Sequence, residues 1–231
     1  MTETVIVKDY SAYTPGKIVL ADNTLVEALN YSAIVSSNPP VAIICGKNGY
    51  GAALGIALHS TRLSWAKEYS TGYNTKFEGI ICTPSQKGSR AAQTATFEGD
   101  IDGSDNWEYI KSIDPAGAAD AATNYPAFHW VNQYNTKYAD KLGGTNFAWY
   151  MPSLAELCGV YKNRGAINES LEKIHGLDSN YADSTPGTSS YWSSSQGSDV
   201  NNGAWYVDFS DGYVDCNSKG NNDRYCCLSG F

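Results

Sequence analysis

The sequence predicts an α+β fold in which antiparallel sheets are combined with two or three helices and a loop-rich C-terminal region. Short apolar runs separated by turn residues occupy the first hundred residues, and helical spacing dominates from about residue 104 to 176. Short strands and polar turns return from residue 177 onwards. The composition agrees, because only 17% of the residues are charged and 13% are aromatic. Such a mixture is typical of an irregular, β-containing fold rather than a helical bundle.

The length of the chain sets the expected domain organisation. With 231 residues, 42% of them hydrophobic, the chain is long enough to bury one large core. We interpret residues 101–231 as the core of the domain, with a distinctive C-terminal segment at about 191–231. Residues 1–100 are expected to form a β-rich part of the same domain or a small subdomain.

Two hairpins are predicted in the first hundred residues. Residues 18–20 and 24–26 are apolar or β-branched and flank Asp22-Asn23, which is a tight-turn signal. Residues 41–45 and 53–58 are continuous apolar runs on either side of a glycine-rich turn. Continuous apolar runs indicate strands that are buried on both faces, so we expect these two runs to be neighbours.

Helix-start signals are concentrated in the middle of the chain. Asp105 and Glu108 have the spacing of a capping box, and so do Ser153 and Glu156, which follow Pro152. Each pair predicts a helix that begins directly after its first residue.

Two further helices in this stretch are marked by proline and glycine. Pro126 is suited to the first turn of a helix, and apolar residues recur after it at helical spacing. Another helix is predicted near residues 166–175, ending at Gly176, because glycine commonly terminates helices.

The charge of the protein excludes some classes of partner. The net charge is −8 and there is no run of Lys and Arg, so we expect no nucleic acid partner and no attraction to an anionic membrane surface. No apolar stretch reaches the roughly 18 residues of a membrane-spanning helix, so we expect no membrane insertion by this segment. Residues 1–4 lack the features of a signal peptide, which is consistent with an intracellular or phage-encoded protein or with a leader that has been removed.

The cysteines do not have the spacing of a zinc site. Cys45, Cys82 and Cys158 lie in apolar surroundings and are interpreted as small buried hydrophobic residues. Cys226 and Cys227 are adjacent, and neighbours on a strand point to opposite faces, so we expect one to be buried and the other exposed.

Candidate metal and catalytic residues are few. Asp100, Asp102 and Asp105 alternate as the ligands of a calcium loop do, but the glycine comes too early and no distal Glu follows, so we favour a turn and a helix cap. His59, His129 and His175 are scattered and no nucleophile motif accompanies them. We therefore predict neither a metal site nor a cofactor, and we interpret the protein as a binder and not an enzyme.

The C-terminal segment alternates in the manner of a half-buried strand. Trp205, Val207 and Phe209 share one face, whereas Tyr206 and Asp208 share the other. A turn at residues 210–213 contains Asp-Gly, the strongest short hairpin signal, and the apolar pattern resumes after it.

A second regularity in this segment comes from the genetic code. Residues 197–223 include no Glu, Gln or Met, and Trp205 and Lys219 are the only Trp and Lys. Every other residue of the window can be encoded by the Asn codon AAC after free replacement of its two adenines, whereas Trp and Lys cannot. The segment therefore divides into fixed residues and freely variable ones. A polar loop that lacks long side chains by chance is the alternative.

Several motifs resemble the variable region of diversity-generating retroelement proteins. They include Tyr-Trp-Ser-Ser-Ser-Gln at 191–196, Ala-Trp-Tyr-Val-x-Phe at 204–209, Lys219, Arg224 and a terminal Gly-Phe. Further motifs lie at 102–107, 126–129 and 149–157, so that the resemblance covers roughly residues 100–231. The sequence departs from the family at 225–228, where Tyr-Cys-Cys-Leu replaces an ending with a second Arg.

The resemblance implies a C-type lectin-like fold of the subtype related to formylglycine-generating enzyme. It also implies a receptor or adhesin-like protein whose surface is rewritten at adenine positions, and which binds a protein ligand on a host, a neighbouring cell or a phage target. By position, the ligand-contacting residues it implies are Gly197, Ser198, Asp199, Val200, Asn201, Asn202, Asp208, Ser210, Asp211, Tyr213, Asp215, Cys216, Asn217, Ser218, Gly220, Asn221, Asn222 and Asp223. The fixed frame it implies consists of Trp192, Trp205, Val207, Phe209, Val214 and Lys219.

Residue chemistry is consistent with this role, because Tyr, Ser, Gly and Asn are common in adaptable binding surfaces. We expect a monomer at the cell surface, with a phage particle or the cytoplasm as alternatives. Two alternative functions follow from the fold resemblance: an oxidase like formylglycine-generating enzyme and a calcium-dependent carbohydrate-binding lectin. The first needs suitably paired reactive cysteines, and the usual sugar-binding motifs of the second are absent from the sequence.

Overall fold

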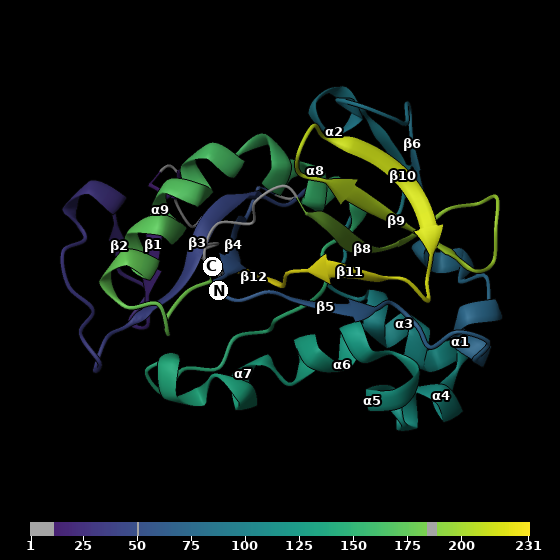
Figure 1. Ribbon diagram of the computed structural model, residues 1–231, viewed down its shortest axis with the longest axis horizontal. Coiled ribbons are helices and arrows are strands. Elements are labelled where there is room, and N and C mark those ends of the chain that lie inside the picture. Colours follow the sequence, from purple (N-terminus) through teal and green to yellow (C-terminus); the bar gives the residue numbers. More distant parts are fainter. Residues whose placement is uncertain (1–11, 50, 184–188) are drawn as a thin grey trace, which may run out of the picture.

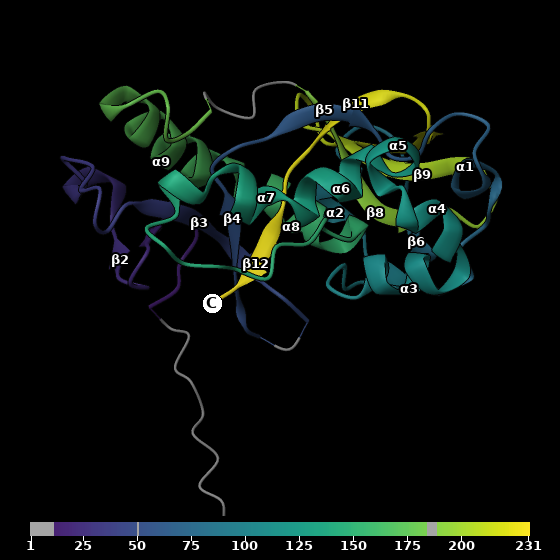
Figure 2. The same ribbon diagram turned by 90° about the horizontal axis from the view of Figure 1, so that it is seen from below.

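The computed structural model describes residues 12–49, 51–183 and 189–231. Helices and antiparallel strands are mixed in it, which confirms the α+β class. Two five-stranded sheets lie side by side, and most of the helices pack around them (Figures 1 and 2). Strands from the first hundred residues and from the C-terminal segment occur together in both sheets.

The first sheet contains both predicted N-terminal hairpins. Its strand order is β12 (Leu228–Gly230), β4 (Ala53–Ala57), β3 (Pro40–Lys47), β1 (Ile18–Leu20) and β2 (Leu25–Val26), and all pairs are antiparallel. Asn23 in the first turn has φ of 66°, a value that Asn tolerates well. Each residue of β4 is buried, as the continuous apolar run predicts.

The second sheet carries the C-terminal segment. Its order is β10 (Tyr213–Ser218), β9 (Gly203–Asp208), β8 (Ser190–Gln196), β11 (Asn222–Tyr225) and β5 (Thr61–Ser64). The pair β8–β11 is parallel, through Arg224 and Tyr191, so this sheet is mixed rather than antiparallel. The reason is that the chain leaves the edge strand β10 and rejoins the sheet beyond β8 instead of extending the hairpin ladder. A third sheet pairs β6 (Cys82–Pro84) with β7 (Phe97–Gly99).

The helices are more numerous and shorter than predicted. Caps and prolines interrupt the middle of the chain: Asp114 precedes Pro115, and Tyr125 precedes Pro126. The α-helices of the described residues are α1 (Thr71–Asn74), α2 (Ala91–Thr94), α3 (Asn106–Ile113), α4 (Pro115–Ala119), α5 (Ala121–Asn124), α6 (Pro126–Asn132), α7 (Tyr134–Lys137), α8 (Leu154–Lys162) and α9 (Arg164–Leu177). Short 3-10 turns are η1 (Ala28–Asn30), η2 (Glu78–Ile80) and η3 (Ala139–Lys141).

The predicted helix ends are partly correct. Ser153 and Glu156 form the predicted capping box of α8, in which Ser153 Oγ accepts from the Glu156 amide at 3.3 Å and Glu156 Oε2 accepts from the Ser153 amide at 2.9 Å. Asp105 precedes α3, but its side chain makes no cap hydrogen bond. Gly176 lies inside α9, which continues to Leu177 and ends where Asp178 becomes extended.

Two apolar clusters fill the space on either side of the sheets. Cys226 belongs to one cluster and Cys227 to the other, and their exposed fractions are 2% and 0%. The prediction that one of them is exposed is therefore wrong. They do point to opposite sides, but both sides of the chain are covered at this position. Cys45, Cys82 and Cys158 are buried, as predicted.

Candidate ligand-binding surface

The hairpin of β9 and β10 separates buried from outward side chains. In β9 the buried residues are Trp205 and Val207, and Val214 of β10 lies opposite Val207. The Trp205 indole nitrogen donates to the Cys82 carbonyl at 2.7 Å, which fixes the ring in the core. The predicted frame is buried throughout, at Trp192, Trp205, Val207, Phe209, Val214 and Lys219.

The other face of this hairpin carries polar side chains that contact one another. The Asp208 carboxylate accepts from Ser190 Oγ at 3.0 Å, and Asn217 Nδ2 donates to Asp223 at 3.3 Å. Strand pairing places Tyr213 beside Asp208 and Asp215 beside Tyr206. Together these residues form the strand patch, which we define as Tyr206, Asp208, Tyr213, Asp215, Asn217 and Asp223.

The strand patch is acidic and mostly half-buried. Burial opposes ionisation of Asp208, but hydrogen bonds from Ser210 and Ser190 outweigh it, so the pKa of Asp208 lies below its usual value. Burial raises the pKa of Asp223. Burial, with nearby Asp215, raises the pKa of Tyr206 to about 12, so its hydroxyl stays protonated and can donate hydrogen bonds at neutral pH. Tyr206 was not among the contact residues implied by the family resemblance. Its position next to buried Trp205 in β9 nevertheless places it on the outward face, with Asp208.

A second group of variable residues lies at one end of the strands, in the loop between β8 and β9. Residues 198–202 are exposed. Gln196 fixes this loop from below, because its side-chain nitrogen donates to the Val200 and Asn201 carbonyls at 3.2 and 2.6 Å. Asn202 Nδ2 donates to the Tyr73 hydroxyl at 3.1 Å. The Gln196 amide thus holds the loop through its backbone carbonyls, so these bonds do not depend on which side chains the loop carries.

The turn between β10 and β11 lies beside this loop. Its residues Ser218, Gly220, Asn221 and Asn222 are exposed or half-buried. The Lys219 amide donates to the Asn202 carbonyl at 2.8 Å, which joins the two segments.

Lys219 anchors this turn from inside the protein. Its side chain is fully buried, and Nζ donates to the Gly72 and Thr75 carbonyls at 3.0 and 2.7 Å. The same nitrogen lies 4.7 Å from the ring centroid of Trp65 and 4.9 Å from that of Phe77. Burial lowers the pKa of Lys219 to about 7. A neutral amine has two N–H donors, which match the two carbonyls.

The structure separates four predicted contact residues from the rest. Gly197 is buried, and a Cβ there would lie 2.7 Å from Cys216 Sγ. Cys216 lies on the core side of β10, where burial raises its pKa to about 12. Gly197 is therefore not part of the exposed surface, and the half-buried Cys216 side chain packs against the core. Ser210 and Asp211 are exposed, but they lie in the turn at the opposite end of the strands, where Asp211 accepts from Ser89 Oγ at 2.6 Å.

The aspartates considered for calcium form turns instead. Asp100 accepts from the Asp102 amide at 3.2 Å and from Asn106 Nδ2 at 2.8 Å, and Asp102 accepts from the Ser104 amide at 2.9 Å. Within the residues that the structure describes, no group of three or more His, Cys, Asp or Glu side chains is arranged to hold a metal ion.

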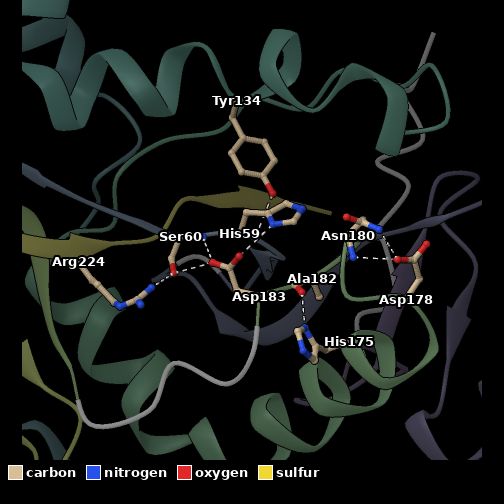
Figure 3. A network of polar contacts seen from close by, with 9 residues as sticks. All are labelled: His59, Ser60, Tyr134, His175, Asp178, Asn180, Ala182, Asp183 and Arg224. Carbon is tan, nitrogen blue, oxygen red and sulfur yellow. Dashed lines mark hydrogen bonds and ion pairs between the residues drawn. The ribbon is translucent and has the colours of Figure 1, made fainter.

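The histidines are packed or hydrogen-bonded within the fold. His59 stacks on Tyr138 with ring centroids 4.2 Å apart, and its Nδ1 lies 3.2 Å from Asp183 Oδ1 (Figure 3). Ser60 Oγ donates to the other oxygen of Asp183 at 3.0 Å. Serine and histidine thus both bind the aspartate, and this is not the order in which a histidine activates a serine nucleophile. The sequence gives no signal for this network, because Asp183 is more than 120 residues away from its partners.

Comparisons with known proteins give one structural likeness. No protein-family model and no curated protein matches the chain. A crystal structure of a fimbrial protein from Bacteroides ovatus superposes with a TM-score of 0.60 at 17% identity. The match covers 94% of this chain and 49% of that protein, so the chain spans about half the length of its neighbour. At this identity the likeness concerns the fold alone. Among the described residues, no helix is long and apolar enough to cross a membrane.

Proposed function

We propose that the protein is an adhesin-like, ligand-binding surface protein whose C-terminal face is diversified by a retroelement. The proposal includes a C-type lectin-like fold and a protein ligand, bound by the strand patch together with the loop at 198–202 and the turn at 218–222. The fimbrial character of the structural neighbour is consistent with display at a cell surface.

One observation carries the proposal: the two residues of 197–223 that adenine replacement cannot produce are both buried, although buried Val207, Phe209 and Val214 can be produced as well. Trp205 and Lys219 cannot be reached from AAC by adenine replacement, and they are 2% and 0% exposed. Asp208, Tyr213 and Asn217 can be reached, and their side chains lie on the outward face of β9 and β10. A chance absence of long side chains does not explain why both unreachable residues lie in the core.

A mixed patch of tyrosines, carboxylates and amides is suited to a protein partner. Tyrosine provides a large contact area with few rotatable bonds, and Asn and Ser adapt their hydrogen bonds.

The two alternative functions, an oxidase and a calcium-dependent lectin, gain less support. Burial raises the pKa of Cys226 to about 12 and that of Cys227 well above its usual value, so neither thiol is a ready nucleophile for an oxidase. Asp100 and Asp102 are engaged in turns rather than in a calcium site.

Sequencing the gene in many cells of one population tests the proposal. We expect substitutions confined to adenine positions of the variable codons, with the Trp205 and Lys219 codons unchanged, and a near-copy of the segment beside a reverse-transcriptase gene. Codons 53–57, which encode the buried strand β4, are the matched control. Substitutions spread evenly over both segments, or a locus without such a copy, would contradict the proposal.

A further inference from the structure

A polar cavity of about 390 Å³ lies on the opposite side of the second sheet from the strand patch. It is lined from β5 by Thr61 and Arg62, from β11 by Arg224, and from α9 and the segment after it by His175, Ser179 and Asp183. Figure 3 shows Arg224, Asp183 and His175 among these residues. Successive strand residues point to opposite faces, so Arg224 points away from Asp223 and the strand patch. The cavity is therefore separate from the surface proposed above.

The cavity contains two arginines directly opposite each other. Arg62 and Arg224 are partners in the register of β5 and β11, so their side chains leave the same face of adjacent strands. Like charges in such a pair destabilise a sheet unless an opposite charge lies between them. In the described part of the chain, no carboxylate lies within the 4.0 Å ion-pair distance of either guanidinium.

The carboxylate that lines the cavity is already engaged, and the one that feels the charge of Arg62, Asp223, lies on the other face of the sheet, where burial raises its pKa. Asp183 lines the cavity, but its Oδ1 lies 3.2 Å from His59 Nδ1, and its Oδ2 accepts from the Ser60 amide at 2.7 Å and from Ser60 Oγ at 3.0 Å. These hydrogen bonds outweigh the effect of burial and hold the pKa of Asp183 below its usual value. Arg224 reaches this network only through Ser60, to whose hydroxyl Nη1 donates at 2.9 Å.

The arginines of the cavity have N–H groups that are not used in hydrogen bonds within the described residues. Arg224 Nε is buried and has no hydrogen-bond partner among the described residues. Arg62 uses Nη2 for Ser189 Oγ at 3.1 Å, and Ser60 and Ser179 are among the residues that line the same cavity. Arginine carries five N–H donors in a planar fork that matches the oxygens of a carboxylate, sulfate or phosphate group.

We propose that this cavity binds a small oxyanion: a carboxylate, sulfate or phosphate group, free or attached to a sugar. The anion lies between Arg62 and Arg224 and relieves the repulsion between them. The surrounding hydroxyls are suited to hydrogen bonds with the ring of an acidic sugar. This second site does not depend on the diversified surface.

Calorimetric titration with sodium sulfate, sodium glucuronate and glucose tests the site. We expect saturable binding of sulfate and glucuronate and none of glucose. Tighter binding of sulfate indicates a free inorganic anion, and tighter binding of glucuronate indicates a sugar-borne one. Absence of saturable binding of both anions, or binding of glucose as tight as that of glucuronate, overturns the proposal.

Charge-matched variants show whether the arginines are responsible. We expect Arg62→Gln and Arg224→Gln each to weaken binding about tenfold, since a hydrogen bond to a charged group contributes about that much. Arg90→Gln, at an exposed residue directly before α2, removes the same charge elsewhere and should leave affinity unchanged. Arg62 is exposed, so its variant is expected to fold even if the Arg224 variant does not. Equal weakening by Arg90→Gln would mean that net charge, not the cavity, binds the anion.

The unliganded proteins provide an independent measurement. Arg62→Gln removes one of two opposed positive charges, so we expect its thermal midpoint without anion to equal or exceed that of the parent protein. Sulfate should then raise the midpoint of the parent more than that of the variant, compared with sodium chloride at equal ionic strength. A large fall in the midpoint of the unliganded Arg62 variant would assign the arginine a structural role instead.

Discussion

The β3–β4 and β9–β10 hairpins are both antiparallel and both contribute to the core, yet they differ in what they leave exposed. Ile43 and Ile44 of β3 are successive residues and both are fully buried, because the first sheet is covered on both faces. In β9 Tyr206 and Asp208 are only half-buried, because this part of β9 and β10 is covered on one face, whereas Ala204 on the same side is buried. Many residues can therefore be substituted in the β9–β10 hairpin, but not in the β3–β4 hairpin, without altering the core. The comparison indicates that one side of a strand pair tolerates substitution where that side is not covered by other elements.

Removing the central ring of the one-sided hairpin should have the largest effect. Trp205→Ala is expected to lower the free energy of unfolding by about 3–5 kcal/mol, because it leaves a cavity in the core and removes the bond to the Cys82 carbonyl. Urea unfolding measures this loss. Tyr206→Ala, one residue away on the other face, is the control, and a loss equal to that of Trp205→Ala would refute the separation of faces.

A matched pair compares the two hairpins directly. Ile43→Ala in β3 should cost about 2–5 kcal/mol, because the side chain is fully buried. Tyr213→Ala in β10 should cost much less, since its side chain lies on the outward face. Thermal unfolding of both variants measures the difference. Similar losses would show that β10 is as constrained as β3.

The buried amine of Lys219 should make the stability of the protein depend on pH. The pKa of its amine is about 7 in the folded protein, against 10.5 for an unperturbed lysine. Between these values the unfolded chain binds the proton and the folded protein does not. This group therefore makes the protein more stable as pH rises from 7 to 9, by up to about 1.4 kcal/mol per pH unit.

Lys219→Met, which has no titratable amine, should lose this slope. Urea unfolding at pH 7, 8 and 9 for both proteins isolates the contribution of the amine from that of the buried tyrosines, which both proteins share. Parallel pH profiles for the two proteins would show that Lys219 stays protonated throughout this range.

The smallest effect is expected for simultaneous changes on the strand patch. Asp208→Asn, Tyr213→Ser and Asn217→Ser together should change the free energy of unfolding by no more than about 1.5 kcal/mol, or about 0.5 kcal/mol each. In Asp208→Asn the remaining amide oxygen can accept from Ser210, and the amide nitrogen can donate to Ser190 Oγ in place of the second acceptor. Calorimetric unfolding of the triple variant tests this. A loss near that of Trp205→Ala would show that these residues belong to the frame.

Local pattern determined much of this protein. Alternation of apolar and polar residues identified β9 and its buried face, the turn at 210–213 and the buried frame, because a strand directs successive side chains to opposite sides. The capping box at Ser153 and Glu156 was correct for a similar reason, since its hydrogen bonds join residues three positions apart. The absence of Glu, Gln and Met from 197–223 is likewise visible in the sequence alone.

Tertiary structure decided everything that depends on which segments meet. Gly197 is buried because the chain after β8 lies against Cys216 of β10, and Cys227, between β11 and β12, is buried because a second cluster covers it. The opposed arginines come from β5 and β11, more than 150 residues apart, so no spacing in the sequence predicts them. The physical reason is that alternation fixes the face on which a side chain lies, whereas only the packed fold fixes what lies against that face.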